Sequence, residues 1–385
     1  ILRFSNARNY TLNITGDFNL QNGQIILMNN AGSTGILNIS GDVSITGGNL
    51  NRGNGNGNVN FTGTTVQTFS KTSGTITNAI AFTVNNNAKV DFGNSVLDGS
   101  TATFTAASGA TLITSHAAGF SSSGATGSIQ VGGTRTYSNT ANYQFNGSNT
   151  GTFTTTSNQV ANLTFNRSAG VTIDRSFSVS GVLNLQSGVV TTGSNAITLG
   201  AAASISNASA SNYINGKLSL TYSAAGTKTF PIGKSGAYRP LNLQYLTLTG
   251  TSVVSAEQFE TSLTGTLPAS TNVDANRYWS IAQTGGSAFT YKLSLDGSGY
   301  TASGTVVLLK KDGATITSNA ATTPNYTNAT AFNTLNSQFA LGSNCSAATT
   351  SNAGGNQTGT TTCGLTTVTL SANTPAYGSG LWTVV

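Results

Sequence analysis

The chain has 385 residues, and only 7% of them are charged, against about 25% in an ordinary soluble protein. Sixteen Lys and Arg stand against ten Asp and Glu, a net charge of +6, but the basic residues are scattered and form no stripe that could neutralise several phosphates. No apolar run reaches the ~18 residues of a membrane span. We therefore expect neither a nucleic-acid partner nor membrane insertion, while 37% hydrophobic residues suffice for a core.

Residues 1–225 predict a repetitive all-β domain. The stretch LNITGDFNLQNGQI (12–25) recurs 25 residues later as LNISGDVSITGGNL (37–50). Looser echoes join 82–92 with 163–173, 59–69 with 143–153 and 19–25 with 184–190. Such a period predicts a parallel β-helix, or β-solenoid, of about nine rungs with Asn ladders at its turns. A series of β-sandwiches would also show short strands and turns, and stays the alternative.

The pattern changes near residue 226, where Pro residues and longer, strictly alternating strands begin. Trp279 lies in the middle of one strand, as the core aromatic of a sandwich does. We predict a separate antiparallel β-sandwich over 226–343. Residues 344–364 are almost wholly small and polar and are typical of a linker, and 365–385 begin a new strand pattern that stops in mid-module. We therefore predict a third segment, 344–385, that continues into the start of an immunoglobulin-like module.

The C-terminal stretch carries a family resemblance. AGGNQTGTTTCGLTTVTLSANTPAYGSGLWTVV (353–385) resembles the opening of the immunoglobulin-like (PKD-like) repeats of giant surface proteins of the Bacteroidota, with Cys363 and Trp382 among the matching residues. The upstream TFPIG…YRPLNL…NRYWSI arrangement is similar to a segment that follows strand repeats in such proteins. The resemblance implies a gliding-motility-type adhesin exported by the type IX secretion system, with surface attachment or secretion machinery as partners.

Two cysteines, Cys345 and Cys363, could close a loop of about 17 residues with a disulfide worth roughly 3 kcal/mol. Two free thiols, or a bond from Cys363 to a residue beyond Val385, are the alternatives.

Five aspartates are candidate catalytic or calcium-binding residues, because β-helices include enzymes that act on polysaccharides with clustered carboxylates. Asp17 and Asp42 occupy equivalent repeat positions, but an Asp after Gly ordinarily accepts hydrogen bonds from nearby backbone N–H groups, so we predict turn residues. Asp91 and Asp98 lack calcium-loop spacing, and adjacent Asp174 and Arg175 would face opposite sides of a strand.

The single histidine, His116, has no nucleophile elbow near it and is predicted to be solvated. GGNLNRGNGNGN (47–58) lacks the Lys and the following helix of a phosphate loop, and we predict a protruding loop. Several aromatic residues of the second domain could form a sugar platform, but a packed core is the expected use. They are Tyr238, Tyr278, Trp279, Tyr291 and Tyr300.

These observations favour a non-catalytic, extracellular stalk or fibre segment of a large bacterial adhesin, without cofactors or metals. Surface polysaccharide or another adhesion target is the expected partner, with self-association as a further option. Because Ile1 begins in mid-pattern, we expect further rungs before it or a second subunit on that edge. The alternatives are a subunit of a self-assembling extracellular filament and a carbohydrate-binding or carbohydrate-active β-helix.

Overall fold

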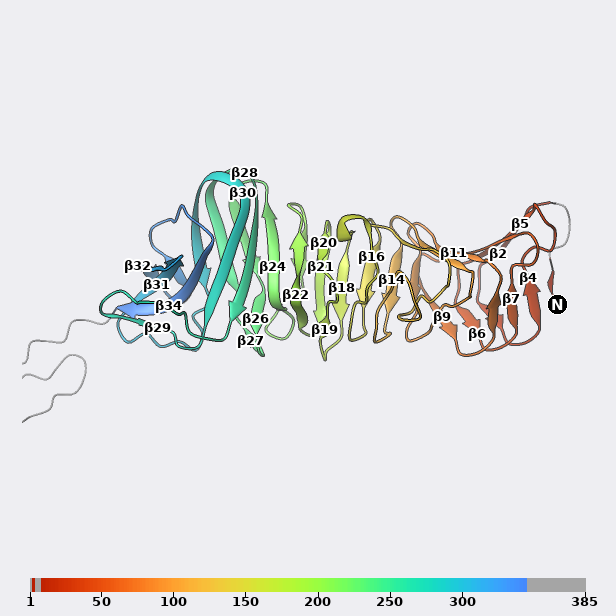
Figure 1. The fold of residues 1–385 in the computed structure, drawn as a ribbon, viewed down its shortest axis with the longest axis horizontal. Helices are drawn as coiled ribbons and strands as arrows, with labels where there is room; N and C mark the ends of the chain where they lie inside the picture. The colour runs from red at the N-terminus through yellow and green to blue at the C-terminus, as the bar shows by residue number, and fades with distance from the viewer. Residues whose placement is uncertain (1, 4–7, 345–385) are drawn as a thin grey trace, which may run out of the picture.

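The computed structural model describes residues 2–3 and 8–344, and within these ranges the protein is built from strands and one short 3-10 turn, Thr156–Asn158, with no α-helix. The body is elongated: parallel rungs stack along one half and longer antiparallel strands form the other end (Figure 1). The predicted β-solenoid followed by antiparallel β-structure is confirmed.

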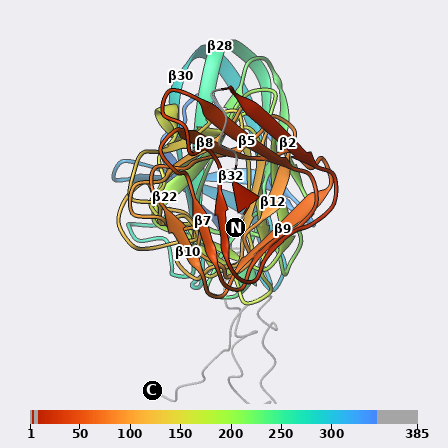
Figure 2. The ribbon, with the colours of Figure 1, turned by 90° about the vertical axis from the view of Figure 1, so that its right-hand side faces the viewer.

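Three parallel sheets form the faces of the solenoid, as the view along its axis shows (Figure 2). The first face contains β2 (Tyr10–Ile14), β5 (Thr34–Ile39), β8 (Asn56–Phe61), β11 (Ala81–Val84), β13 (Thr103–Ala106) and β15 (Arg135–Tyr137). The second face contains β3 (Phe18–Leu20), β6 (Val43–Ile45), β9 (Val66–Lys71), β12 (Lys89–Asp91), β14 (Thr111–Thr114), β16 (Asn142–Phe145), β18 (Leu163–Asn166), β21 (Val182–Ser187) and β23 (Ser204–Ser206). Its nine strands match the expected number of rungs.

The third face is the least regular. It begins with β1 (Leu2–Arg3), β4 (Gln24–Ile26), β7 (Asn49–Asn51) and β10 (Thr75–Thr77). An isolated parallel bridge joins Leu97 to Ile129, and further along β19 (Val171–Thr172) pairs with the first residues of β22 (Val190–Leu199). The last residues of β22 pair with β20 (Phe177–Val179), which itself pairs with β17 (Gln159–Val160). One strand thus turns the corner between two faces.

The register confirms that the 25-residue echo is one rung. Leu12 lies beside Leu37 and Ile14 beside Ile39 on the first face, and Phe18 lies beside Val43 on the second. The looser echoes are different. Residues 82–92 run from β11 to β12, hence from the first to the second face, whereas 163–173 run from β18 to β19, hence from the second to the third. Each looser echo therefore corresponds to a similar strand–corner–strand segment and not to a whole rung.

The glycine-rich stretch 47–58 is not the protruding loop that the sequence predicted. Half of it lies in β7 and at the start of β8, and the corner 52–55 connects the two strands. A Cβ at Gly47 would collide with the carbonyl oxygen of Gln21, and one at Gly53 with that of Met28. The glycines therefore serve close approach between successive rungs, and Gly53 also adopts a φ of +79°, which favours glycine.

A stack of aromatic rings fills the interior of the solenoid. Phe120, which is fully buried, contacts five other rings at centroid separations of 5.8–6.4 Å. Neighbouring contacts extend this stack from Phe61 to Phe177. The alternating strands supply these side chains because every second residue points inward. Each rung buries its apolar side chains only against its neighbours, so the stack depends on the continuous repeat.

The solenoid order ends at β24 (Ile214–Tyr222), which pairs parallel with β22 along one side. On its other side it pairs parallel with β26 (Ile232–Lys234) over two residues and antiparallel with β28 from Leu218 to Tyr222. Ten strands follow it: β25 (Gly226–Phe230), β26 (Ile232–Lys234), β27 (Ala237–Tyr238), β28 (Leu241–Phe259), β29 (Thr271–Val273), β30 (Tyr278–Leu295), β31 (Thr305–Asp312), β32 (Thr315–Thr322), β33 (Tyr326–Asn328) and β34 (Ser337–Asn344). The pairing changes where the sequence pattern changes, near residue 226, but the hydrogen-bonded sheet runs on through β24.

The hydrophobic core is also continuous across this junction. One buried cluster includes Phe18 near the first rung, Leu220 in β24, and Trp279 and Leu341 among the antiparallel strands. A second, small cluster lies on the other side of β31 and β34 and includes Leu309 and Ala340. The two halves thus share one main interior. The predicted immunoglobulin-like start, 345–385, lies outside the described residues.

Candidate functional surface

The two repeat-related aspartates, Asp17 and Asp42, lie one above the other, as their spacing predicted. The Oδ1 of Asp17 accepts a hydrogen bond from the backbone N–H of Asp42 at 2.9 Å, and the Oδ1 of Asp42 accepts one from the N–H of Thr68 at 2.7 Å. The prediction that they serve backbone N–H groups is confirmed, and the donors belong to the next rung. Each carboxylate therefore joins two rungs at a corner.

The remaining acidic residues of the solenoid are engaged separately. Asp91 accepts the N–H of Gly93 at 2.8 Å, and Asp174 accepts that of Gly151 at 2.6 Å. Asp98 pairs with Lys71 at 3.0 Å. Among the described residues, no group of three or more His, Cys, Asp or Glu side chains is placed to hold a metal ion. Each of these carboxylates has its own backbone or lysine partner.

Arg175 and His116 also serve local structure. The Arg175 guanidinium donates to the carbonyl of Phe153 and to Asn158, and burial lowers its pKa. The Nδ1 of His116 accepts a hydrogen bond from the N–H of Ala118 at 3.1 Å, within a partly buried turn.

A buried arginine that sequence reasoning missed organises the longest rung, in which Leu112 pairs with Tyr143, 31 residues on. Arg135 is 8% exposed and donates to the carbonyl oxygens of Ser121, Gly124 and Val131. Burial lowers its pKa, and none of the ion pairs among the described residues includes it. An arginine in a short alternating strand resembles an outward-facing residue, so the sequence carried no signal for this role.

The aromatic residues of the antiparallel half are divided in their use. Trp279 and Tyr291 are fully buried, as the core prediction required. Tyr238, Tyr278 and Tyr300 are partly buried, and each contacts another ring. Tyr278 stacks on Phe259 with ring centroids 4.8 Å apart. The rings contact separate partners rather than forming one platform.

Ion pairs join the ends of several antiparallel strands, a second feature that the sequence did not reveal. Arg239 lies 3.3 Å from Glu260 and 3.4 Å from Asp296, while Arg277 lies 2.7 Å from Asp274. Arg277 and Asp274 are almost completely buried. Because each carboxylate has a guanidinium partner, this network ties strand ends together and has no uncommitted acid.

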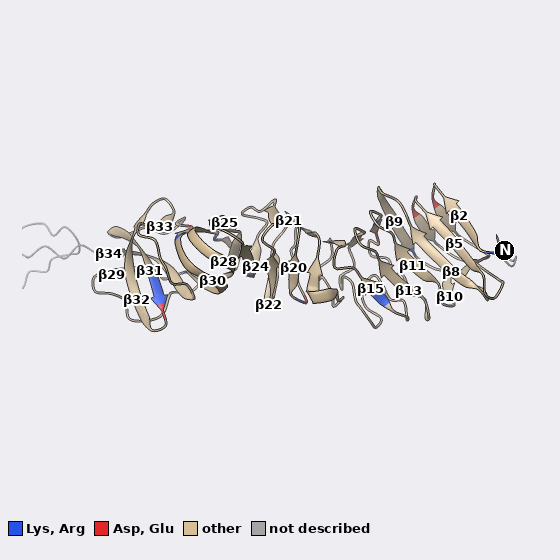
Figure 3. Cartoon of the chain, turned by 90° about the horizontal axis from the view of Figure 1, so that it is seen from above, with Lys and Arg blue, Asp and Glu red and all other residues tan. Residues whose placement is uncertain are grey.

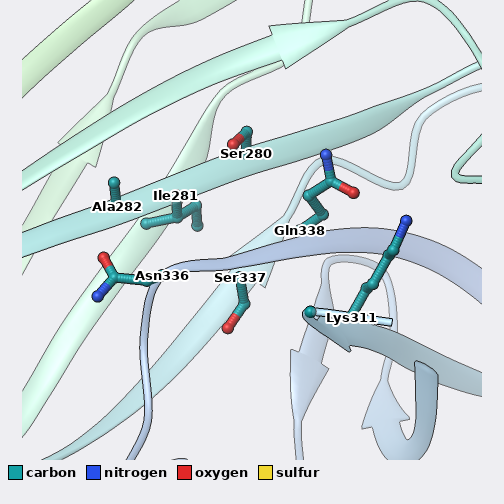
Figure 4. A pocket seen from close by; sticks show the side chains of 8 residues that line it. Ser280, Ile281, Ala282, Lys311, Asn336, Ser337 and Gln338 are labelled. Carbon is teal, nitrogen blue, oxygen red and sulfur yellow. The ribbon is translucent and has the colours of Figure 1, made fainter. Parts of the chain in front are cut away.

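A shallow hollow lies between β30 and β34 (Figure 4). Lys311 lies at one side of it with its Nζ 2.7 Å from the carbonyl oxygen of Thr264, and Asn336 lies at the other side and accepts the N–H of Gln283. Ser337 donates to Asp312. Lys311, Asn336 and Ser337 are thus engaged with the protein itself, so the hollow is a weak candidate for a ligand site.

The first face of the solenoid is the most regular surface of the molecule. Its outward residues form two columns that run across the rungs, because every second residue of each strand points to solvent. The first column contains Asn13, Asn38, Asn60, Thr83, Thr105 and Thr136, and the second contains Thr11, Ile36, Asn58, Ala81 and Thr103. None is charged and none is aromatic. Figure 3 looks onto this face, and in it the strands β2, β5, β8 and β11 are tan, the colour of uncharged residues.

Side-chain hydrogen bonds fix the asparagine half of the first column. Asn38 donates to the Oδ1 of Asn13 at 2.7 Å, and Asn60 donates to the Oδ1 of Asn38 at 2.8 Å. The sequence predicted Asn ladders at the turns, whereas this ladder joins residues within the strands β2, β5 and β8. The hydroxyls of Thr83 and Thr105, further along the same column, have no partner within the described residues. This column therefore presents an ordered set of polar groups that a partner can reach.

The described residues include no helix long and apolar enough to cross a membrane. Cys345 and Cys363 lie outside the described residues, so their pairing stays a prediction. In comparisons with protein-family models, with curated proteins and with solved structures, no significant match to this chain was found.

Proposed function

We propose that the protein is a non-catalytic, extracellular structural and adhesive segment, a stalk or fibre portion of a large bacterial surface adhesin. The observation that carries this proposal is the stack of rungs itself, with one hydrophobic core that runs from the first rungs into the antiparallel end. The resemblance of residues 353–385 to repeats of Bacteroidota surface proteins is its second support, and with it come type IX secretion and a role in gliding or attachment.

The mechanical basis is hydrogen bonding along the rod. Backbone bonds between successive parallel strands run nearly parallel to the long axis, and ladders such as Asn13–Asn38–Asn60 add side-chain bonds in the same direction. Bending the rod would open several of these bonds together. A stiff spacer that carries an adhesive surface away from the cell needs this property.

A filament subunit is the second candidate, because the strands β2 and β3 form an open edge at the first rung. Head-to-tail stacking requires a matching parallel edge at the other end of the body. Among the described residues, the strands at the other end of the body, including β29 and β34, pair antiparallel. The adhesive rod is therefore preferred to a polymer of stacked solenoids.

A carbohydrate-active enzyme is the third candidate. It requires two carboxylates on either side of a bound sugar. The aspartates of the solenoid instead serve backbone N–H groups or a lysine, and those of the antiparallel half serve cations. These commitments favour structure over catalysis.

The test uses antibodies raised against the folded protein. Intact cells that carry the sequence should be labelled without permeabilisation, and denaturing agarose gels of their surface protein should show a band of hundreds of kilodaltons. Labelling only after permeabilisation would overturn the extracellular role. A band near the 39.0 kDa of this chain would overturn the giant adhesin and favour the filament subunit.

A further inference from the structure

The two outward columns of the first face keep strict register. The pairings β2–β5, β5–β8, β8–β11, β11–β13 and β13–β15 contain no register shift. On the second face, by contrast, the pairing of β18 with β21 shifts after Phe165, and Lys89 and Asp91 point outward. The first face thus repeats its polar groups about every 4.8 Å across the rungs and about every 7 Å along each strand.

The groups of this array are held in place before any partner arrives. Threonine is branched at Cβ, so Thr83, Thr103 and Thr105 have few rotamers to lose. The asparagines Asn38 and Asn60 are fixed by their ladder and keep a second amide hydrogen that points away from it. Preorganised donors and acceptors bind with a smaller entropic cost than mobile ones.

The chemistry of the face restricts its partner. Without Lys or Arg it has no attraction for nucleic acid or for anionic polymers. Without Trp, Tyr or Arg it lacks the side chains that dominate protein–protein binding energy. Rows of hydroxyl and amide groups, interrupted by the apolar Ile36 and Ala81, complement a surface that is itself uncharged, hydroxyl-rich and periodic.

We propose that the first face of the solenoid, from β2 to β15, binds an uncharged, ordered polysaccharide. This inference rests on the proposed adhesive function and names its ligand class. Six strands span about 24 Å, so one polysaccharide chain meets several rungs at once. Many weak hydrogen bonds along one chain act together, because the first contact raises the effective concentration of the next.

The test measures retention of the full chain on an insoluble neutral polysaccharide, cellulose, and on an anionic one, cross-linked alginate. The wild type should bind cellulose and not alginate. The double variant T83V/T105V removes two hydroxyls but keeps the side-chain shape, and should lower the apparent affinity about tenfold, whereas T83S/T105S should keep it. T83E/T105E should abolish binding.

The matched control, Q144E/T164E, places two carboxylates on neighbouring rungs of the second face and should bind as the wild type does. Circular dichroism and thermal unfolding verify that each variant is folded. Equal affinity of T83V/T105V and wild type, or equal loss in the control variant, would overturn the assignment. Adsorption to ice through the same residues, without retention on cellulose, would overturn the ligand class.

The two proposals fail in different ways. If no neutral polysaccharide is retained while antibodies still label intact cells, only the ligand class of this face is wrong. If cellulose binding depends on Thr83 and Thr105 but labelling requires permeabilisation, the extracellular role is wrong and the binding face remains.

Discussion

The carboxylates have different partners in the two halves of this protein. In the solenoid, Asp17, Asp42 and Asp174 accept backbone N–H groups of a neighbouring rung, and Asp98 is the one carboxylate with a cation partner among the described residues there. In the antiparallel half every carboxylate of the described residues lies within an ion pair. These pairs involve Glu257, Glu260, Asp274, Asp296 and Asp312.

The difference follows from backbone geometry. A solenoid turns a corner every few residues, and each corner leaves N–H groups that no strand partner reaches. A short side chain that accepts from the next rung satisfies them. The long strands β28 and β30 pair with each other over most of their length, so few of their backbone N–H groups need a side-chain acceptor. Acidic side chains at the strand ends are then available for guanidinium groups, as at Asp274 and Asp296.

Both halves contain buried tyrosines, and raising the pH should change the free energy of unfolding more than any of the substitutions below. Burial raises the pKa of Tyr137 and Tyr143 in the solenoid and of Tyr222 and Tyr291 towards and within the antiparallel half. Above pH ~10 the unfolded tyrosines lose protons while the folded ones keep them, so stability falls as pH rises. Four such groups predict a loss of about 5–6 kcal/mol per pH unit. Denaturant titrations at a series of alkaline pH values measure it, and an unchanged free energy of unfolding would contradict the burial.

Removing the central ring of the aromatic stack tests whether the core is one unit. Phe120→Ala should cost about 3–5 kcal/mol, because five ring contacts are lost and a cavity remains. Phe120→Leu is the matched control with a smaller loss. In a Trp382→Phe background, Trp279 fluorescence reports on the antiparallel half. If the Trp279 fluorescence of Phe120→Ala changes at the same denaturant concentration as that of the protein with Phe120, the two halves unfold independently. That result would refute the shared core.

Breaking the buried ion pair tests the antiparallel half. Asp274→Ala removes the carboxylate 2.7 Å from the buried guanidinium of Arg277 and leaves it with Asp296 at 3.7 Å, so the variant should cost about 3 kcal/mol in unfolding free energy. The double variant D274A/R277M removes both charges and should recover much of the loss. A double variant as unstable as the single one would show that the charge itself is not the cause.

The corner carboxylates test the solenoid half. Asp42→Ala removes the acceptor for the N–H of Thr68 and should cost about 1 kcal/mol. Asp42→Asn keeps an oxygen in place and should cost less. The difference in unfolding free energy between Asp42→Ala and the wild type should be the same at low and high salt, because Asp42 acts as a hydrogen-bond acceptor. A strong salt dependence of this difference would point to a charge effect instead.

The smallest effect is expected at the one ion pair of the solenoid. Asp98→Asn removes the partner of Lys71 at 3.0 Å, but the Asp98 side chain is 45% exposed, so the loss should stay below about 1 kcal/mol and vanish in high salt. If denaturant unfolding shows a larger loss of unfolding free energy for Asp98→Asn than for Asp42→Ala, ion pairs contribute more to the solenoid than the corner carboxylates do, contrary to this comparison.

The sequence predicted the solenoid because a strict repeat is visible wherever the rung length stays constant, as between Leu12 and Leu37. It predicted the role of Asp17 and Asp42 for the same reason. It misread 47–58, because glycines that permit close packing between rungs look like glycines of a loop. It missed Arg135 and the pair of Arg239 with Asp296, since those contacts join residues whose distance in sequence follows no period.

The dual pairing of β24 has a consequence for how the molecule forms. The antiparallel strands β28 and β30 are neighbours in sequence apart from one connection, so they can assemble early as a hairpin. Once β24 has joined β28, its other edge presents a complete row of parallel hydrogen-bonding groups. Each preceding rung can then add with a loop closure of about 20–25 residues, a small and constant entropic cost. In these terms the antiparallel end is a template, and the solenoid grows from it towards its first rung.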